Sequence, residues 1–169
     1  MFLTPPLAAL ACNLPALVRL RRAPAAPRAR LLFERALAAA ALDVHHLWLS
    51  AVEAFAVEAS FKKWMNLVGR HRPDYQWRLE HGQDVREGLF SYPSGHAAEM
   101  FAVGTVLALY FLGKARVLDP SAAQARWGGQ LALTAACLLP LGGATLVALS
   151  RVAGYRHDFS DVNAGMALG

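Results

Sequence analysis

The sequence has few of the residues that mark disulfide-rich or nucleic-acid-binding proteins. It contains two cysteines, Cys12 and Cys137, and each lies inside an apolar stretch, where a thiol packs as a small hydrophobic side chain. This excludes a disulfide framework and indicates no cysteine metal site. The net charge is +5, but the arginines lie in short loops beside apolar segments rather than on an aromatic-bearing surface. This pattern argues against nucleic acid as a partner.

Charged residues make up only 17% of the chain, and they are absent from long segments. Gly129 to Leu149 carries no charge over 21 residues, and about 20 apolar residues of helix cross the hydrocarbon core of a bilayer. Ala97 to Gly113 has one charged residue, Glu99, and Phe2 to Val18 has none, although it contains three prolines. Hydrophobic residues make up 56% of the chain. We therefore predict an all-α, polytopic protein embedded in the bilayer.

The basic residues predict how this bundle is oriented. No basic residue precedes the apolar run Phe2 to Val18, whereas a secretory signal peptide would have one, so we interpret this run as a span. The basic loops at Arg19 to Arg30 and Lys114 to Arg126 belong on the cytoplasmic side. The segments Arg70 to His96 and Arg151 to Asp161 are then expected on the opposite, extracytoplasmic or lumenal face.

One predicted span, Leu31 to Trp64, is more polar than a lipid-exposed helix should be. At about 100° per residue, Asp43, His46, Ser50 and Glu53 fall on one narrow stripe. This predicts that the stripe faces the interior of the bundle. His45 and His46 are adjacent and therefore point in different directions on a helix. We predict an interfacial pair there rather than a metal site.

Reactive and charged side chains are most concentrated in the segment Ser150 to Asp161, SRVAGYRHDFSD, which lies between apolar stretches. His157 and Asp161 are four residues apart, so a helix that begins near His157 would bring the carboxylate to one ring nitrogen of the imidazole. The other ring nitrogen would be free to attack as a nucleophile. Arg151 adds a fork of donors that matches the oxygens of a phosphate.

A second candidate segment is Ser91 to Phe101, SYPSGHAAEMF, a turn that continues into an apolar helix. Pro93 and Gly95 permit a tight turn, and Ser94 suits the N-cap position. The free amides of the first helical turn make a seat for an anion. His96 stands at this seat, where it could act as the general acid that protonates a departing alkoxide.

With RHRP at residues 70 to 73, the chain has three ordered motifs, the others being PSGH at 93 to 96 and the segment 150 to 161. Their order resembles the type 2 phosphatidic acid phosphatases, also called lipid phosphate phosphatases. The third motif of that family reads SR, five residues, H, three residues, D, and every fixed position is present. The flanks VGRHRPDY, DVHH and GKARV are most similar to the plant and algal branch.

The resemblance implies a six-helix membrane bundle that hydrolyses phosphatidic acid and related lipid phosphomonoesters through a phosphohistidine. It implies no metal and no cofactor. His157 would be the nucleophile, Asp161 its orienting carboxylate, and His96 the acid for the leaving group. The residues implied to hold the phosphate oxygens are Arg72, Ser94, Gly95 and Arg151.

The chain departs from the family in its first motif, residues 65 to 73. That motif begins with a lysine seven positions before the arginine of its RP pair, and here the position is Met65. On an ideal helix Lys63 projects about 160° away from Met65 and Lys62 only about 60° away. Lys62 is therefore the candidate substitute cation. Glu58, one turn earlier, could instead hold Lys62 in an i,i+4 pair.

The chain also differs from the family at its ends. We expect one partial domain over residues 1 to 169, in which one of six helices is missing and the last is reduced to Val162 to Gly169. Two alternative functions follow. Met65 and the missing helices fit a lipid-phosphate-binding pseudoenzyme with weak or no turnover. The vanadium-dependent haloperoxidases resemble the same motifs, but they are soluble, and the uncharged run Gly129 to Leu149 argues against that class.

Overall fold

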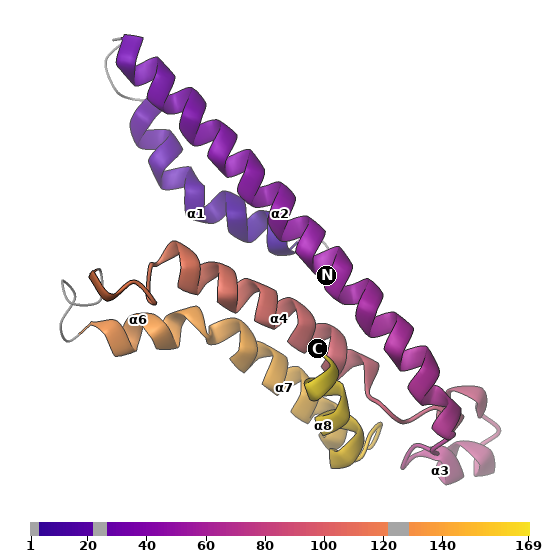
Figure 1. Cartoon of the computed structure of the whole chain (residues 1–169). Coiled ribbons are helices and arrows are strands. Elements are labelled where there is room, and N and C mark those ends of the chain that lie inside the picture. The colour runs from indigo at the N-terminus through magenta and orange to yellow at the C-terminus, as the bar shows by residue number, and fades with distance from the viewer. Residues whose placement is uncertain (1–3, 22–26, 122–128) are drawn as a thin grey trace. The chain divides into compact units, whose positions relative to one another are not determined.

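A computed structural model describes residues 4–21, 27–121 and 129–169 of the chain (Figure 1). Within these ranges all the regular secondary structure is helical, so the predicted all-α class is confirmed. The elements are α1 (Thr4–Arg21), α2 (Pro27–Met65), η1 (Asn66–Val68), α3 (Tyr75–Glu80), η2 (Arg86–Leu89), α4 (Gly95–Lys114), α6 (Gln130–Cys137), α7 (Leu139–Ala153) and α8 (Phe159–Leu168).

The chain divides into two compact units, Met1–Glu53 and Ala54–Gly169, and all three motifs belong to the second. In the first unit, Asn13 Nδ2 of α1 donates a hydrogen bond to Asp43 Oδ2 of α2 at 2.9 Å. His46, Ser50 and Glu53, which were predicted to share an interior stripe with Asp43, are exposed. The interior stripe stays a prediction for these three residues.

One helix in the described residues, α4, is long and apolar enough to cross a membrane. A second candidate is the pair α6 and α7, if the two count as one span, although their axes are bent by 46°. The predicted span from Gly129 to Leu149 is thus not one continuous helix, because the helix breaks at Leu138. Pro140, near the start of α7, lacks an amide hydrogen and its ring clashes with the carbonyl four residues earlier, which breaks a continuous helix.

Small residues let α4 pack closely against α7 and α8, which lie beside it in Figure 1. A Cβ on Gly165 of α8 would lie 2.4 Å from the carbonyl oxygen of Ser94, so the two backbones are in direct contact there. Ser94 N donates to the carbonyl oxygen of Asp161 at 2.9 Å. This packing brings the third motif against the second. The buried small residues are Ala97, Ala98, Ala102, Gly104 and Ala108 on α4, and Ala144 and Ala148 on α7.

Candidate active site

The first motif follows the end of α2 and lies beside the segment that leads to α4. Gly69 ends η1, the short helix that follows α2, with a left-handed φ of 65° that glycine adopts without strain. Two backbone hydrogen bonds of 2.8 Å follow, from Ser91 N to the carbonyl oxygen of Arg70 and from Arg72 N to that of Gly88. The RHRP segment is therefore held against the chain that precedes the second motif.

The third motif starts α8 two residues later than predicted. Asp158 is the N-cap and forms a capping box with Asp161, in which each side chain accepts from the other residue's backbone amide. The Asp158 amide lies 3.0 Å from Asp161 Oδ2. His157 thus precedes the helix, and the prediction that it shares a helical face with Asp161 is wrong, because Asp158 takes the N-cap position.

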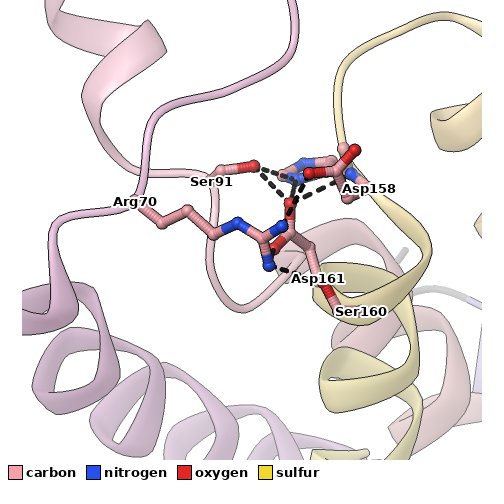
Figure 2. A network of polar contacts seen from close by, with 6 residues as sticks. Arg70, Ser91, Asp158, Ser160 and Asp161 are labelled. Atoms are coloured by element: carbon pink, nitrogen blue, oxygen red, sulfur yellow. Dashed lines mark hydrogen bonds and ion pairs between the residues drawn. The ribbon is translucent and has the colours of Figure 1, made fainter.

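His157 and Asp161 nevertheless lie close together. Asp161 belongs to the network of polar contacts drawn in Figure 2. The side chains of His157 and Asp161 are 4% and 0% exposed, and His157 Nδ1 is 3.8 Å from Asp161 Oδ2. The hydroxyl of Ser91 is nearer to both. It donates to Asp161 Oδ2 at 2.5 Å and lies 3.4 Å from His157 Nδ1. Nδ1 therefore faces the serine and the carboxylate, which leaves Nε2 as the nitrogen available for chemistry.

Arg70 joins the first motif to the third. Its guanidinium donates to Ser160 Oγ at 2.5 Å and to Asp158 Oδ2 at 2.7 Å, and Nη1 lies 3.1 Å from Asp161 Oδ1 (Figure 2). No role was predicted for Arg70 or Ser91 from the sequence. Their positions in the sequence could have indicated a role, because Arg70 lies two residues before Arg72 and Ser91 lies two residues before Pro93.

Burial lowers the pKa of the His157 imidazole to about 4, and the nearby Arg72 guanidinium acts in the same direction. Asp161 and a backbone hydrogen bond with Ser91 oppose this shift, while His96 adds to it. The ring is therefore neutral at physiological pH, which is the state that a nucleophilic nitrogen requires. These electrostatic contributions also mean that Arg72 and His96, from two different motifs, lie near the ring.

The turn before α4 differs from the prediction in one respect. Ser94 precedes the helix as expected, but its hydroxyl makes no capping hydrogen bond. Ser94 is fully buried, and its Oγ has no hydrogen-bond partner among the residues that the structure describes. His96, two residues later, is exposed. A buried hydroxyl without a partner, at a helix N-terminus, is well suited to bind an oxygen of an anion.

Lys62 lies directly against this turn. A Cβ on Gly95 would be only 2.0 Å from Lys62 Nζ, so the ammonium group occupies the space beside the Gly95 backbone. Glu58 is buried and interacts electrostatically with both Lys62 and Glu99, but its Oε1 has no hydrogen-bond partner in the described part of the chain. Glu58 therefore does not draw Lys62 away from the turn, because the ammonium group lies beside Gly95. Lys63 is exposed.

Arg151 stands apart from these contacts. It lies in the last turn of α7, and its Nε donates to Ser150 Oγ at 3.3 Å. Within the described ranges, no hydrogen bond or ion pair joins it to His157 or Asp161. Its predicted contact with phosphate stays a prediction. The structure thus brings His157, Asp161, Arg72 and His96 into one region, with Lys62 against the neighbouring Gly95.

Comparison with known proteins identifies the family. A PA-phosphatase related-family protein of Dictyostelium discoideum is 38% identical over 130 residues, covering 75% of this chain and 46% of that protein. Lipid phosphate phosphatase 1 of Arabidopsis thaliana is 32% identical over 145 residues, covering 75% and 42%. Diacylglycerol pyrophosphate phosphatase 1 of Saccharomyces cerevisiae is 34% identical over 125 residues, covering 62% and 40%.

The chain therefore spans less than half the length of these curated relatives. No solved structure gives a significant match. The family model described as PAP2 superfamily matches residues 44–169, a range that includes all three motifs and the whole network around His157. On this match and these relatives, the chain belongs to the PAP2 superfamily.

Proposed function

We propose that this chain carries the active site of a membrane lipid phosphate phosphatase, which hydrolyses phosphatidic acid and related lipid phosphomonoesters to the dephosphorylated lipid and phosphate. The observation that carries the proposal is the convergence on one buried imidazole. His157 is near Arg72 of the first motif and His96 of the second, and Asp161 of the third lies 3.8 Å away. Relatives named lipid phosphate phosphatase support the substrate class.

In the proposed first step, Nε2 of neutral His157 attacks the phosphorus atom and the bond to the lipid oxygen breaks. His96 donates a proton to the departing alkoxide, which leaves as an alcohol. A water molecule then attacks the phosphohistidine, His96 takes a proton from this water, and the bond from phosphorus to His157 breaks to release phosphate. The proposed steps use no metal or cofactor, because protein side chains supply the positive charge around the phosphate.

The proposed seat for the phosphate oxygens is the start of α4. It offers the unpartnered hydroxyl of Ser94 and the amide of Gly95 at the positive end of the helix dipole. Arg72 and Lys62 would add positive charge beside it. Arg151 is included on the strength of the motif resemblance. A dianionic phosphomonoester suits a seat with this many cations and donors.

The proposal is tested by phosphate release from phosphatidic acid in mixed detergent micelles, catalysed by the purified full chain in the presence of EDTA. We expect steady turnover that EDTA does not reduce. Met65 favours one rival, a lipid-binding pseudoenzyme. Binding to vesicles that contain phosphatidic acid, without any phosphate release, would establish that rival and refute the phosphatase. Running the assay with diacylglycerol pyrophosphate as well identifies the preferred headgroup.

We further propose that the site faces the extracytoplasmic or lumenal side. In a variant without Cys12 and Cys137, a Gln83→Cys thiol is expected to react with a probe that cannot cross membranes, because Gln83 is exposed in the motif-bearing loop. A Ser121→Cys thiol, also at an exposed position, should react only after the membrane is permeabilised. Labelling in the opposite pattern would reverse the assigned orientation.

A further inference from the structure

We infer that Arg70 is a positioning residue of the reaction, which holds the first turn of α8 and the Asp161 carboxylate in place for His157. This inference deepens the proposed function and rests on it. Arg70 belongs to the first motif, but it is not among the residues proposed to hold the phosphate. Its side chain extends instead to the start of α8, where it contacts Asp158, Ser160 and Asp161 (Figure 2).

The backbone of Arg70 is itself anchored. Its carbonyl oxygen accepts a hydrogen bond from Ser91 N at 2.8 Å, which fixes residue 70 to the segment that leads into α4. From this position the guanidinium donates to Ser160 Oγ at 2.5 Å and to Asp158 Oδ2 at 2.7 Å. The planar fork of a guanidinium holds two acceptors in a fixed geometry. Arg70 therefore links the segment before the second motif to the first turn of the helix that ends the third.

The third contact of Arg70 involves a buried charge. Asp161 is 0% exposed, and its Oδ1 lies 3.1 Å from Arg70 Nη1 without accepting a hydrogen bond from the described residues. The other ion-pair partner of this carboxylate is His157, whose lowered pKa leaves the ring neutral at physiological pH. Within the described ranges, Arg70 is thus the one permanently charged group paired with Asp161. Removing it would leave a buried charge uncompensated, which is strongly destabilising.

The Arg70 contact also determines which carboxylate oxygen faces the histidine. Arg70 pairs with Oδ1 of Asp161, whereas Oδ2 is the oxygen 3.8 Å from His157 Nδ1. Oδ2 also accepts the Asp158 amide at 3.0 Å in the capping box. Rotation of the carboxylate would break either the cap or the Arg70 contact. Oδ2 therefore stays directed at the imidazole, where it can stabilise the positive charge that the ring gains when Nε2 bonds to phosphorus.

The exposure of its partners indicates which contact of Arg70 has the largest effect. The side chains of Arg70 and Asp158 are 41% and 49% exposed, and pairs as exposed as this contribute little by themselves. Asp161 is fully buried, so its charge is screened less by water and salt. We therefore expect the loss of Arg70 to disturb Asp161 and the first turn of α8 more than the rest of the fold.

The kinetic test compares kcat and KM for phosphatidic acid in the full chain and three variants, Arg70→Gln, Arg70→Lys and Arg116→Gln. Arg70→Gln is expected to lower kcat by about 10- to 100-fold with KM changed less than about threefold, because the lost contacts position the nucleophile without touching substrate. Arg70→Lys should recover part of kcat, since an ammonium group can pair with Asp161 but lacks the fork. Arg116→Gln, the matched control, removes a pair with Asp119 outside the motifs and should keep the wild-type kcat.

A second measurement, hydrogen exchange, needs no turnover. The amides of Asp161 and Val162 both donate to the Asp158 carbonyl oxygen at 3.1 Å. Their exchange should be about tenfold faster or more in Arg70→Gln, with exchange along α4 unchanged, because only the first turn of α8 is released. Arg116→Gln should exchange like the wild type at both places. Faster exchange throughout α4 as well would show that Arg70 stabilises the whole fold, and would overturn the inference.

Two kinetic results would also overturn it. One is a wild-type kcat in Arg70→Gln, and the other is a KM raised about tenfold or more, which would make Arg70 a substrate contact. Normal turnover of the wild type, together with unchanged exchange in Arg70→Gln, would refute this inference alone. A wild-type protein that releases no phosphate would refute the proposed function, and the exchange measurement would then still test whether Arg70 holds α8.

Discussion

His157→Ala is expected to abolish phosphate release, because the substitution removes the only atom proposed to bond to phosphorus. Loss of the nucleophile in a covalent enzyme costs on the order of 10⁴-fold or more in kcat. A phosphohistidine is stable in base but is hydrolysed in acid. Enzyme quenched in base after mixing with labelled phosphatidic acid should therefore carry label in the wild type and none in His157→Ala.

Two further variants make this experiment specific. His81→Ala is the matched control, since His81 is exposed, stacks on Trp77 and lies outside the network, and it should keep full activity and full labelling. Asp161→Asn should retain some label, since it leaves the attacking nitrogen in place. Turnover that persists in His157→Ala would refute the phosphohistidine route, even if the protein hydrolyses lipid phosphates.

Lys62→Ala is expected to lower kcat/KM for phosphatidic acid by about 10- to 150-fold, which corresponds to the loss of one charged hydrogen bond of roughly 1.5 to 3 kcal/mol. The reason is the position of the ammonium group, which lies against the Gly95 backbone at the proposed phosphate seat. Lys63→Ala is the matched control, because Lys63 is exposed and adjacent in sequence. It should leave kcat/KM within about twofold of wild type, as a solvated charge normally does.

The same idea predicts a rescue. Met65 occupies the position at which the family motif has its lysine, on nearly the same side of α2 as Lys62. In the otherwise wild-type chain, Met65→Lys should change kcat/KM little, since Lys62 already supplies a cation beside the phosphate seat and would repel a second one. In the Lys62→Ala background it should restore most of the lost kcat/KM. If Lys62→Ala behaves like Lys63→Ala, no cation from the end of α2 reaches the substrate.

Several features of the site could be predicted from the sequence because they depend on neighbours along the chain. Gly69 ends the helical segment because only glycine adopts its backbone conformation easily. Lys62 rather than Lys63 reaches the turn because the helical repeat sets the direction of each side chain. The residues of the third motif were likewise identified by type and spacing.

The predicted start of α8 was wrong because Asp158, and not His157, takes the N-cap position. The four-residue spacing of His157 and Asp161 fits a shared helical face, but Asp158 is a better N-cap than His157, and the capping box starts the helix at Phe159, two residues after His157. The two side chains still lie close together, with His157 Nδ1 3.8 Å from Asp161 Oδ2. Spacing predicted the proximity, and capping decided its geometry.

The sequence by itself determined the helical class, the family resemblance and the residue types that can carry phosphoryl transfer, since each of these depends on local pattern. Only the tertiary structure decided how the histidine meets its acid. Ser91 and His157 are 66 positions apart, and Arg70 and Asp158 are 88 apart. No periodicity relates positions so distant. They meet because small residues let α8 pack against the start of α4, and because backbone hydrogen bonds hold the RHRP segment against Ser91.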